Sequence, residues 1–162
     1  MKQAFRTEQQ APTVAHMPAI RLAGLMRRYP ATPEAMAGLA KQWRDFAHGA
    51  GGALLAKGLV MYGIHIGLFD TNEDEYFSGV EIGARDKIPS GLSELRLPPI
   101  TCAVIDHDGP VGEISQTTSM VLREGAVRLA SVRPFDLIER YGKGFDPQIA
   151  RGDIQLIIPV EE

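Results

Sequence analysis

The chain has 162 residues, of which 44% are hydrophobic and 23% charged, a size and composition typical of one domain with its own core. Its 17 basic and 20 acidic residues give a net charge of -3 and are scattered along the sequence. Because no basic face is concentrated enough to neutralise a run of phosphates, direct binding of nucleic acid is not expected.

The N-terminal part of the chain predicts a tail, a strand and a helix. Residues 1–17 are expected to form a flexible tail, and residues 1–15 lack the apolar core of a secretion signal, so a cytoplasmic protein is expected. Residues 19–29 partly alternate between apolar and polar side chains and predict a strand. The triplet Thr32-Pro33-Glu34 then supplies an N-cap, a first-turn proline and an acid, which predicts an amphipathic helix ending at Gly49.

A glycine-rich joint, residues 49–52, leads into two predicted strands, residues 60–69 and 75–82. The longest apolar stretch is interrupted by Lys57 and His65, so no membrane span is expected.

Residues 70–74 form an acidic turn whose spacing to Glu81 imitates a calcium loop. However, Glu75 occupies the position where that loop needs glycine, and the flanks are strands rather than helices. The turn is therefore predicted to be a solvated hairpin turn.

Glycines recur inside these two strands, at positions 63, 67, 79 and 83. A glycine in a strand marks either a bulged, curved sheet or the close approach of a ligand or another backbone. The sequence leaves both readings open.

The second half of the chain repeats the order of the first, with a strand at residues 95–106, a helix at 110–124 and strands at 135–141 and 154–160. Cys102 lies in an apolar run, where a buried, unreactive thiol is expected. His107 precedes the turn Asp108-Gly109-Pro110, which favours a structural role for this histidine.

Two βαββ modules, residues 18–83 and 92–162, predict an α+β fold with a curved, mostly antiparallel sheet. Both helices are expected on one face, with a central ligand cleft on the other.

Strand alternation places Leu137, Glu139 and Tyr141 on one face of the predicted strand 135–141. A carboxylate among apolar and aromatic neighbours pairs with a cation of the protein, pairs with a ligand, or has its pKa raised until it is neutral. These residues alone do not choose among the three. The histidines are dispersed and no nucleotide-binding or nucleophile motif is present, so neither a metal nor a cofactor is expected.

Several motifs occur in a defined order along the chain. They are residues 18–24, the pair Trp43 and Phe46, and residues 62–64, 76–82, 88–92, 101–110, 135–141, 145–147 and 154–160. With these motifs the sequence resembles the gyrase-inhibitor-like domain, which is also the effector-binding domain of many AraC-type and MerR-type multidrug regulators. The resemblance extends from Pro18 to Val160.

The resemblance implies a small-molecule sensor or sequestering protein whose cleft glutamate, Glu139 here, faces cationic lipophilic ligands. Aromatic cleft residues stack on such ligands, and the matching positions are Trp43, Tyr62 and Tyr76, with Phe46 and Tyr141 as further candidates. Val111 stands where the family often has an aromatic residue, which leaves the pocket shape and ligand identity open.

The resemblance also implies two alternatives. One is a hydrolase of electrophilic toxins, with Glu139 as general base assisted by Tyr76 or Tyr141. The other is an interaction protein that contacts gyrase or a separate regulator, and a homodimer is also considered. Regulators of this family carry a helix-turn-helix segment ahead of the domain. Too few residues precede Pro18 to form one, so direct promoter binding is not expected.

Overall fold

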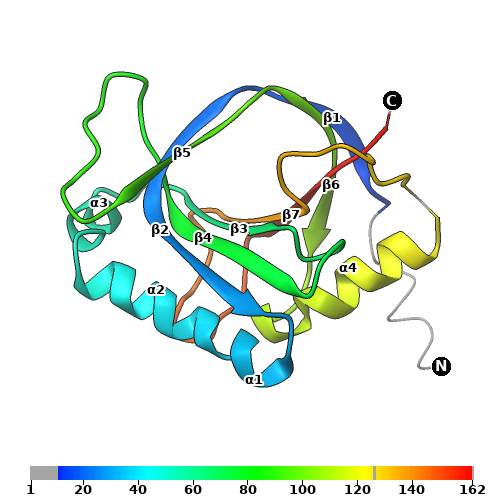
Figure 1. Ribbon diagram of the computed structural model, residues 1–162, viewed down its shortest axis with the longest axis horizontal. Helices are drawn as coiled ribbons and strands as arrows, with labels where there is room; N and C mark the ends of the chain where they lie inside the picture. The colour runs from blue at the N-terminus through cyan, green and yellow to red at the C-terminus, as the bar shows by residue number, and fades with distance from the viewer. Residues whose placement is uncertain (1–10, 126, 162) are drawn as a thin grey trace.

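The computed structural model describes residues 11–125 and 127–161 (Figure 1). The strands are β1 (Thr13–Met17), β2 (Ile20–Pro30), β3 (Met61–Ile66), β4 (Glu73–Glu81), β5 (Ser93–Leu97), β6 (Ile100–His107), β7 (Leu137–Tyr141) and β8 (Ile154–Pro159). The helices are α1 (Pro33–Met36), α2 (Gly38–His48), α3 (Gly52–Ala56) and α4 (Ile114–Arg123), with the 3-10 turn η2 (Val111–Glu113) before α4.

The strand order confirms the predicted duplication. All strands join one eight-stranded sheet in the order β1-β6-β8-β7-β3-β4-β2-β5, and every pairing between named strands is antiparallel. The first half contributes the block β3-β4-β2 and the second half the block β6-β8-β7. The two blocks meet where β3 pairs with β7, so the centre of the sheet is also the junction between the modules.

The strand predicted at residues 95–106 is two strands, β5 and β6, and that prediction was wrong. Pro98 and Pro99 separate them, because proline has no N–H to donate to a ladder. β5 crosses to pair with β2 of the first module. In the same way β1 pairs with β6 of the second module, so residues 13–17 of the predicted tail form a strand. Residues 1–10 of that tail lie outside the described part.

The single helix predicted up to Gly49 is two helices, α1 and α2, and the first of them begins as predicted. The Thr32 hydroxyl accepts a hydrogen bond from the Ala35 N–H at 3.2 Å, which caps α1, and α2 ends at Gly49. The glycine-rich joint 49–52 was not expected to lead into a helix, yet α3 begins at Gly52. The helix predicted at 110–124 is confirmed from Ile114 to Arg123 and begins one turn late, after η2.

Helices cover one face of the sheet, as predicted, and Figure 1 shows α2 and α4 on the same side of it. The cleft was expected on the opposite face, and this expectation was wrong. That face carries an apolar cluster, whose buried members include Leu22, Tyr62, Ile64, Phe77, Ile138 and Ile157. The pocket described below lies instead on the helix-bearing side.

Two local predictions are confirmed. Cys102 is buried and forms no disulfide. His107 is buried, and its ring nitrogens lie 2.9 Å from the Thr117 hydroxyl and 2.8 Å from the Pro110 carbonyl oxygen, a structural arrangement. Within the described ranges, no helix combines the length and apolar character needed to cross a bilayer.

Candidate ligand-binding site

Glu139 lies at the centre of the sheet, on β7, directly opposite Gly63 of β3. It shares one face of β7 with Leu137 and Tyr141, as strand alternation predicts. This is the helix-bearing face, whereas the cleft glutamate was expected on the opposite one. A Cβ atom at position 63 would collide with the Tyr76 hydroxyl and lie 2.9 Å from Glu139 Oε1. Gly63 therefore leaves the room in which Glu139 and Tyr76 meet, so the close approach at this glycine is by side chains of the protein itself.

The cation that pairs with Glu139 comes from the protein. His65, two residues after Gly63 and on the same face of β3, places Nε2 at 2.7 Å from Glu139 Oε2. Its other ring nitrogen, Nδ1, lies 2.6 Å from Asp74 Oδ2. All three side chains are buried, and we call them the Glu139–His65–Asp74 network.

This network has an unbalanced charge. Burial lowers the pKa of His65, but the adjoining carboxylates of Glu139 and Asp74 outweigh this effect and raise it to about 10. The imidazole is therefore protonated at neutral pH, and both ring nitrogens donate hydrogen bonds. Burial acts to raise the pKa of Glu139, but the His65 charge and the hydrogen bonds it accepts lower the pKa overall. At their formal charges, two carboxylates and one imidazolium leave one negative charge uncompensated.

Two tyrosines and a tryptophan extend the network toward the surface. The Tyr141 hydroxyl donates to Glu139 Oε1 at 2.6 Å, and the Tyr76 hydroxyl donates to the same oxygen at 3.4 Å. Burial, and then the Glu139 charge, raise the pKa of both tyrosines well above 10. The indole N–H of Trp43 on α2 donates to the Tyr76 hydroxyl at 2.8 Å. Trp43 also meets the Tyr141 ring edge to face, at 6.0 Å between centroids.

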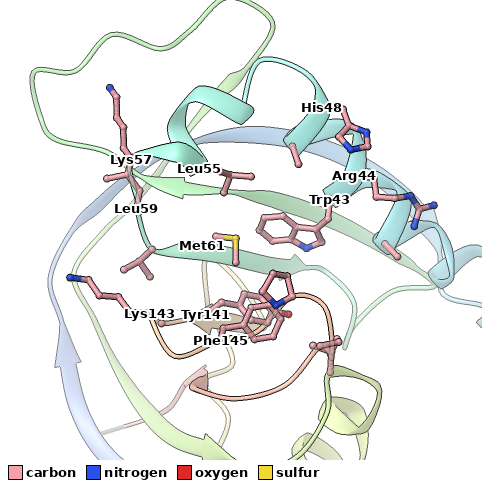
Figure 2. Close-up of a pocket in the computed structure, with 18 residues that line it drawn as sticks. Trp43, Arg44, His48, Leu55, Lys57, Leu59, Met61, Tyr141, Lys143 and Phe145 are labelled. Atoms are coloured by element: carbon pink, nitrogen blue, oxygen red, sulfur yellow. The ribbon is translucent and has the colours of Figure 1, made fainter.

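A pocket opens above these rings, between α2, α3 and the segment 142–150 (Figure 2). Its volume is about 1020 Å³, at the upper end of the range for small-molecule sites. The lining is mainly apolar and aromatic, with Trp43, Leu55, Leu59, Met61, Tyr141 and Phe145 as its principal side chains. In Figure 2, Trp43, Met61, Tyr141 and Phe145 lie around the same space.

The charged side chains at this pocket are all basic. Arg44, Lys57 and Lys143 line it, together with His48, and among its described lining residues there is no aspartate or glutamate. Arg44, Lys57 and Lys143 are exposed. Within residues 11–125 and 127–161 no group of three or more His, Cys, Asp or Glu side chains is arranged to hold a metal ion.

The structure brings together four of the six residues that the sequence selected. Trp43 and Tyr141 line the pocket, while Glu139 and Tyr76 lie beneath it. Phe46 is fully buried and packs edge to face against Trp43 at 5.9 Å, so it supports the wall from behind. Tyr62 lies on the other face of the sheet, where its hydroxyl bonds Glu81 and Arg140. The structure does not place it with Glu139.

Sequence reasoning missed His65 and Asp74. Asp74 was expected in a solvated turn, which is wrong: β4 begins at Glu73, and Asp74 is fully buried on the side of His65. The signal was present in the alternation of β3, which puts Met61, Gly63 and His65 on one face. A histidine in an apolar, buried strand needs a polar partner, and the acidic turn that follows the strand was the nearest candidate in sequence.

A family model of GyrI-like small molecule binding domains matches residues 10–160. The chain belongs to this family. The resemblance found in the sequence is thereby confirmed, and the GyrI-like domain is a small-molecule-binding domain. No curated protein matches the sequence.

Solved structures share the GyrI-like fold at low sequence identity. SAV2435 bound to tetraphenylphosphonium matches with a TM-score of 0.71 and 16% identity over 94% of each chain. The EcmrR C-terminal domain matches with a TM-score of 0.65 and 12% identity, over 96% of this chain and 99% of that one. A hydrolase from Listeria innocua matches with a TM-score of 0.57 and 13% identity, over 99% and 96% respectively. At these identities the likeness shows the fold alone.

Proposed function

We propose that this GyrI-like domain senses or sequesters a lipophilic organic cation, which it binds in the pocket between α2 and the segment 142–150. The ligand lies against the rings of Trp43 and Tyr141, and the Glu139–His65–Asp74 network beneath them is its negative counterpart. The observation that carries the proposal is the burial of two carboxylates, Glu139 and Asp74, on a single histidine under an aromatic floor. The tetraphenylphosphonium bound to SAV2435, a protein of the same fold, supports it.

The floor suits a bulky cation for two physical reasons. A cation over a tryptophan or tyrosine face gains about 0.5–2 kcal/mol from the ring quadrupole, and more as water is excluded. The Tyr141 hydroxyl donates to a carboxylate, and in a buried hydrogen-bonded chain each group polarises the next, which makes the ring more electron-rich. Because the network is buried, its net charge is also screened less than a surface charge.

In this arrangement Glu139 acts without touching the ligand. It does not line the pocket, and Tyr141 stands between the carboxylate and the cavity. The charge specificity therefore belongs to the whole network, and removal of Asp74 is expected to have the same sign of effect as removal of the Glu139 charge.

The geometry supports binding better than hydrolysis with Glu139 as general base. Both carboxylate oxygens already accept hydrogen bonds, Oε1 from the two tyrosines and Oε2 from His65. The pKa of Glu139 is lowered, which makes it a weaker base, and Glu139 is not among the residues that line the pocket.

The test is titration with tetraphenylphosphonium, followed by the fluorescence of Trp43, the only tryptophan in the chain. The wild type is expected to show saturable quenching. Glu139→Gln and Asp74→Asn each remove one negative charge and are expected to weaken binding by about 1–3 kcal/mol, the range for loss of a charged partner. Lys87→Gln, at an exposed position outside the pocket, is the control and is expected to bind as the wild type does. Unchanged affinity in both charge variants would refute the proposal.

A further inference from the structure

Two basic side chains that line the pocket, Lys57 and Lys143, have no role in binding a cation. We call the end of the pocket where they lie its mouth. Lys57 follows α3 and Lys143 follows β7, so two distant parts of the sequence bring them to the same cavity. Figure 2 draws both on the same side of the pocket, away from Arg44 and His48. Positive charge at this position repels a purely cationic ligand.

Neither lysine is neutralised by a side chain in the part of the chain that the structure describes. No ion pair is found for Lys57 or Lys143 within residues 11–125 and 127–161. Asp153, which lies beside the backbone of residues 142–144, is already engaged by the Gly144 N–H at 2.9 Å and does not line the pocket. The chain has a net charge of -3, yet the charged side chains among the described lining residues of the pocket are all basic. The pocket therefore differs in charge from the protein as a whole.

The two ends of the pocket therefore differ in charge. The floor lies over two carboxylates that share one histidine, and the end with Lys57 and Lys143 carries two ammonium groups that form no ion pair with a described residue. A ligand complementary to both ends has a positive, aromatic part that reaches Trp43 and Tyr141 and a negative substituent that stays at the mouth. Ammonium groups bind carboxylate, phosphate and sulfate alike as point charges.

We propose that the ligand of this pocket is zwitterionic: an aromatic cation that also carries an anionic group, bound by Lys57 and Lys143. This inference rests on the proposed function, because it takes the cationic part to lie on the Trp43–Tyr141 floor. It adds a second point of recognition that separates such ligands from simple lipophilic cations.

Two dyes differ in the required group and in little else. Rhodamine 123 is a methyl ester with a cationic ring system, and rhodamine 110 is the same dye with a free carboxylate. We expect rhodamine 110 to bind the wild-type protein about fivefold more tightly at low salt, since two partly exposed ion pairs together contribute on this scale. The preference is expected to shrink as sodium chloride is added, because the lysines are exposed.

The variants assign the preference to the two lysines. The double variant Lys57→Gln/Lys143→Gln is expected to bind the two dyes with equal affinity, because it no longer attracts the carboxylate of rhodamine 110 or repels the cation of rhodamine 123. Lys87→Gln, which removes an exposed lysine outside the pocket, is expected to keep the fivefold preference. Thermal unfolding of each variant checks that the fold is retained.

Each outcome is decisive. Equal binding of the two dyes by the wild type overturns the zwitterion inference and leaves the proposed function standing. A preference for rhodamine 110 that survives in the double variant also overturns the inference. So does an equal loss of affinity for both dyes, because the lysines then do not bind the carboxylate. If neither dye nor tetraphenylphosphonium binds, the proposed function itself fails and the inference fails with it.

Discussion

Tyr141 donates its hydroxyl to Glu139 at 2.6 Å while its ring forms part of the pocket wall. One side chain thus connects the buried charge to the cavity. The carboxylate is buried, and the hydrogen bond to it fixes the orientation of the ring. This relationship makes the hydroxyl and the ring of Tyr141 separable by mutation.

Tyr141→Phe keeps the ring and removes one donor to a buried carboxylate. We expect the free energy of unfolding to fall by about 1–3 kcal/mol, the cost of leaving a buried polar group without its partner. The affinity for tetraphenylphosphonium is expected to stay within about threefold, whereas Tyr141→Ala loses the ring contact and binds at least tenfold more weakly. Urea unfolding and Trp43 fluorescence titrations measure the two effects. Equal binding by the Phe and Ala variants would show that the ring does not contact the ligand.

The stability of the domain is expected to depend on pH through His65. The pKa of this group is raised from 6.5 to about 10 in the folded state, so its contribution is fully present below pH 6.5 and is lost as the pH rises toward 10. We therefore expect the free energy of unfolding to decrease over this window. His65→Gln removes the titrating group, and its stability is expected to vary less between pH 6.5 and 10. Parallel pH profiles for the two proteins would contradict the assignment of a protonated His65.

Gly63→Ala tests the space between Glu139 and Tyr76. The added methyl group would collide with the Tyr76 hydroxyl and lie against Glu139 Oε1, so one of these side chains must move. We expect a loss of about 1–3 kcal/mol of stability, as for other overpacked cores, and weaker binding of tetraphenylphosphonium. Gly112→Ala is the matched control, because a Cβ there meets no atom within 4 Å. Wild-type stability and wild-type binding in Gly63→Ala would contradict the prediction that the space at Gly63 is needed by Glu139 and Tyr76.

A buried ion pair holds the start of β7 to the turn after β3. The Arg133 guanidinium bonds Asp136 at 2.7 Å, both side chains are at most 5% exposed, and Asp136 also accepts the Phe69 N–H at 2.8 Å. Arg133→Met leaves Asp136 buried without its cation and is expected to cost about 3–5 kcal/mol.

Arg128→Met provides the comparison for this variant. It removes a surface arginine whose side chain is 84% exposed and lies 3.9 Å from Glu161, and it is expected to change stability by less than about 1 kcal/mol. Urea unfolding measures both variants. A small effect at Arg133 would mean that the pair is not needed to position β7.

The sequence was sufficient to predict the α+β fold and the duplicated modules, because these follow from period-2 alternation and from caps such as Thr32. Alternation also puts Leu137, Glu139 and Tyr141 on one face, but it does not say that this is the helix-bearing face. It was not sufficient for the path of β5, since its pairing with β2 is a long-range choice that only the Pro98-Pro99 break hints at. The location of the pocket was also missed. Both sheet faces carry apolar residues, and the alternation pattern does not say on which face a pocket lies.

The partner of Glu139 was missed for a different reason. Its distance in sequence from His65 hides their contact, and the register of β3 against β7 alone puts them together. The residues by themselves left a protein cation, a ligand or a raised pKa open for Glu139. The structure gives the first, because His65 pairs with Glu139. Under the proposed function the carboxylate then acts from behind the Tyr141 ring.

A crystal structure of the protein with tetraphenylphosphonium tests the central claim most directly. The account predicts the cation in the pocket, with its phenyl groups against Trp43 and Tyr141, and Glu139 still bonded to His65. Tetraphenylphosphonium on the opposite face of the sheet beside Tyr62, or in direct contact with a Glu139 that has released His65, would contradict it.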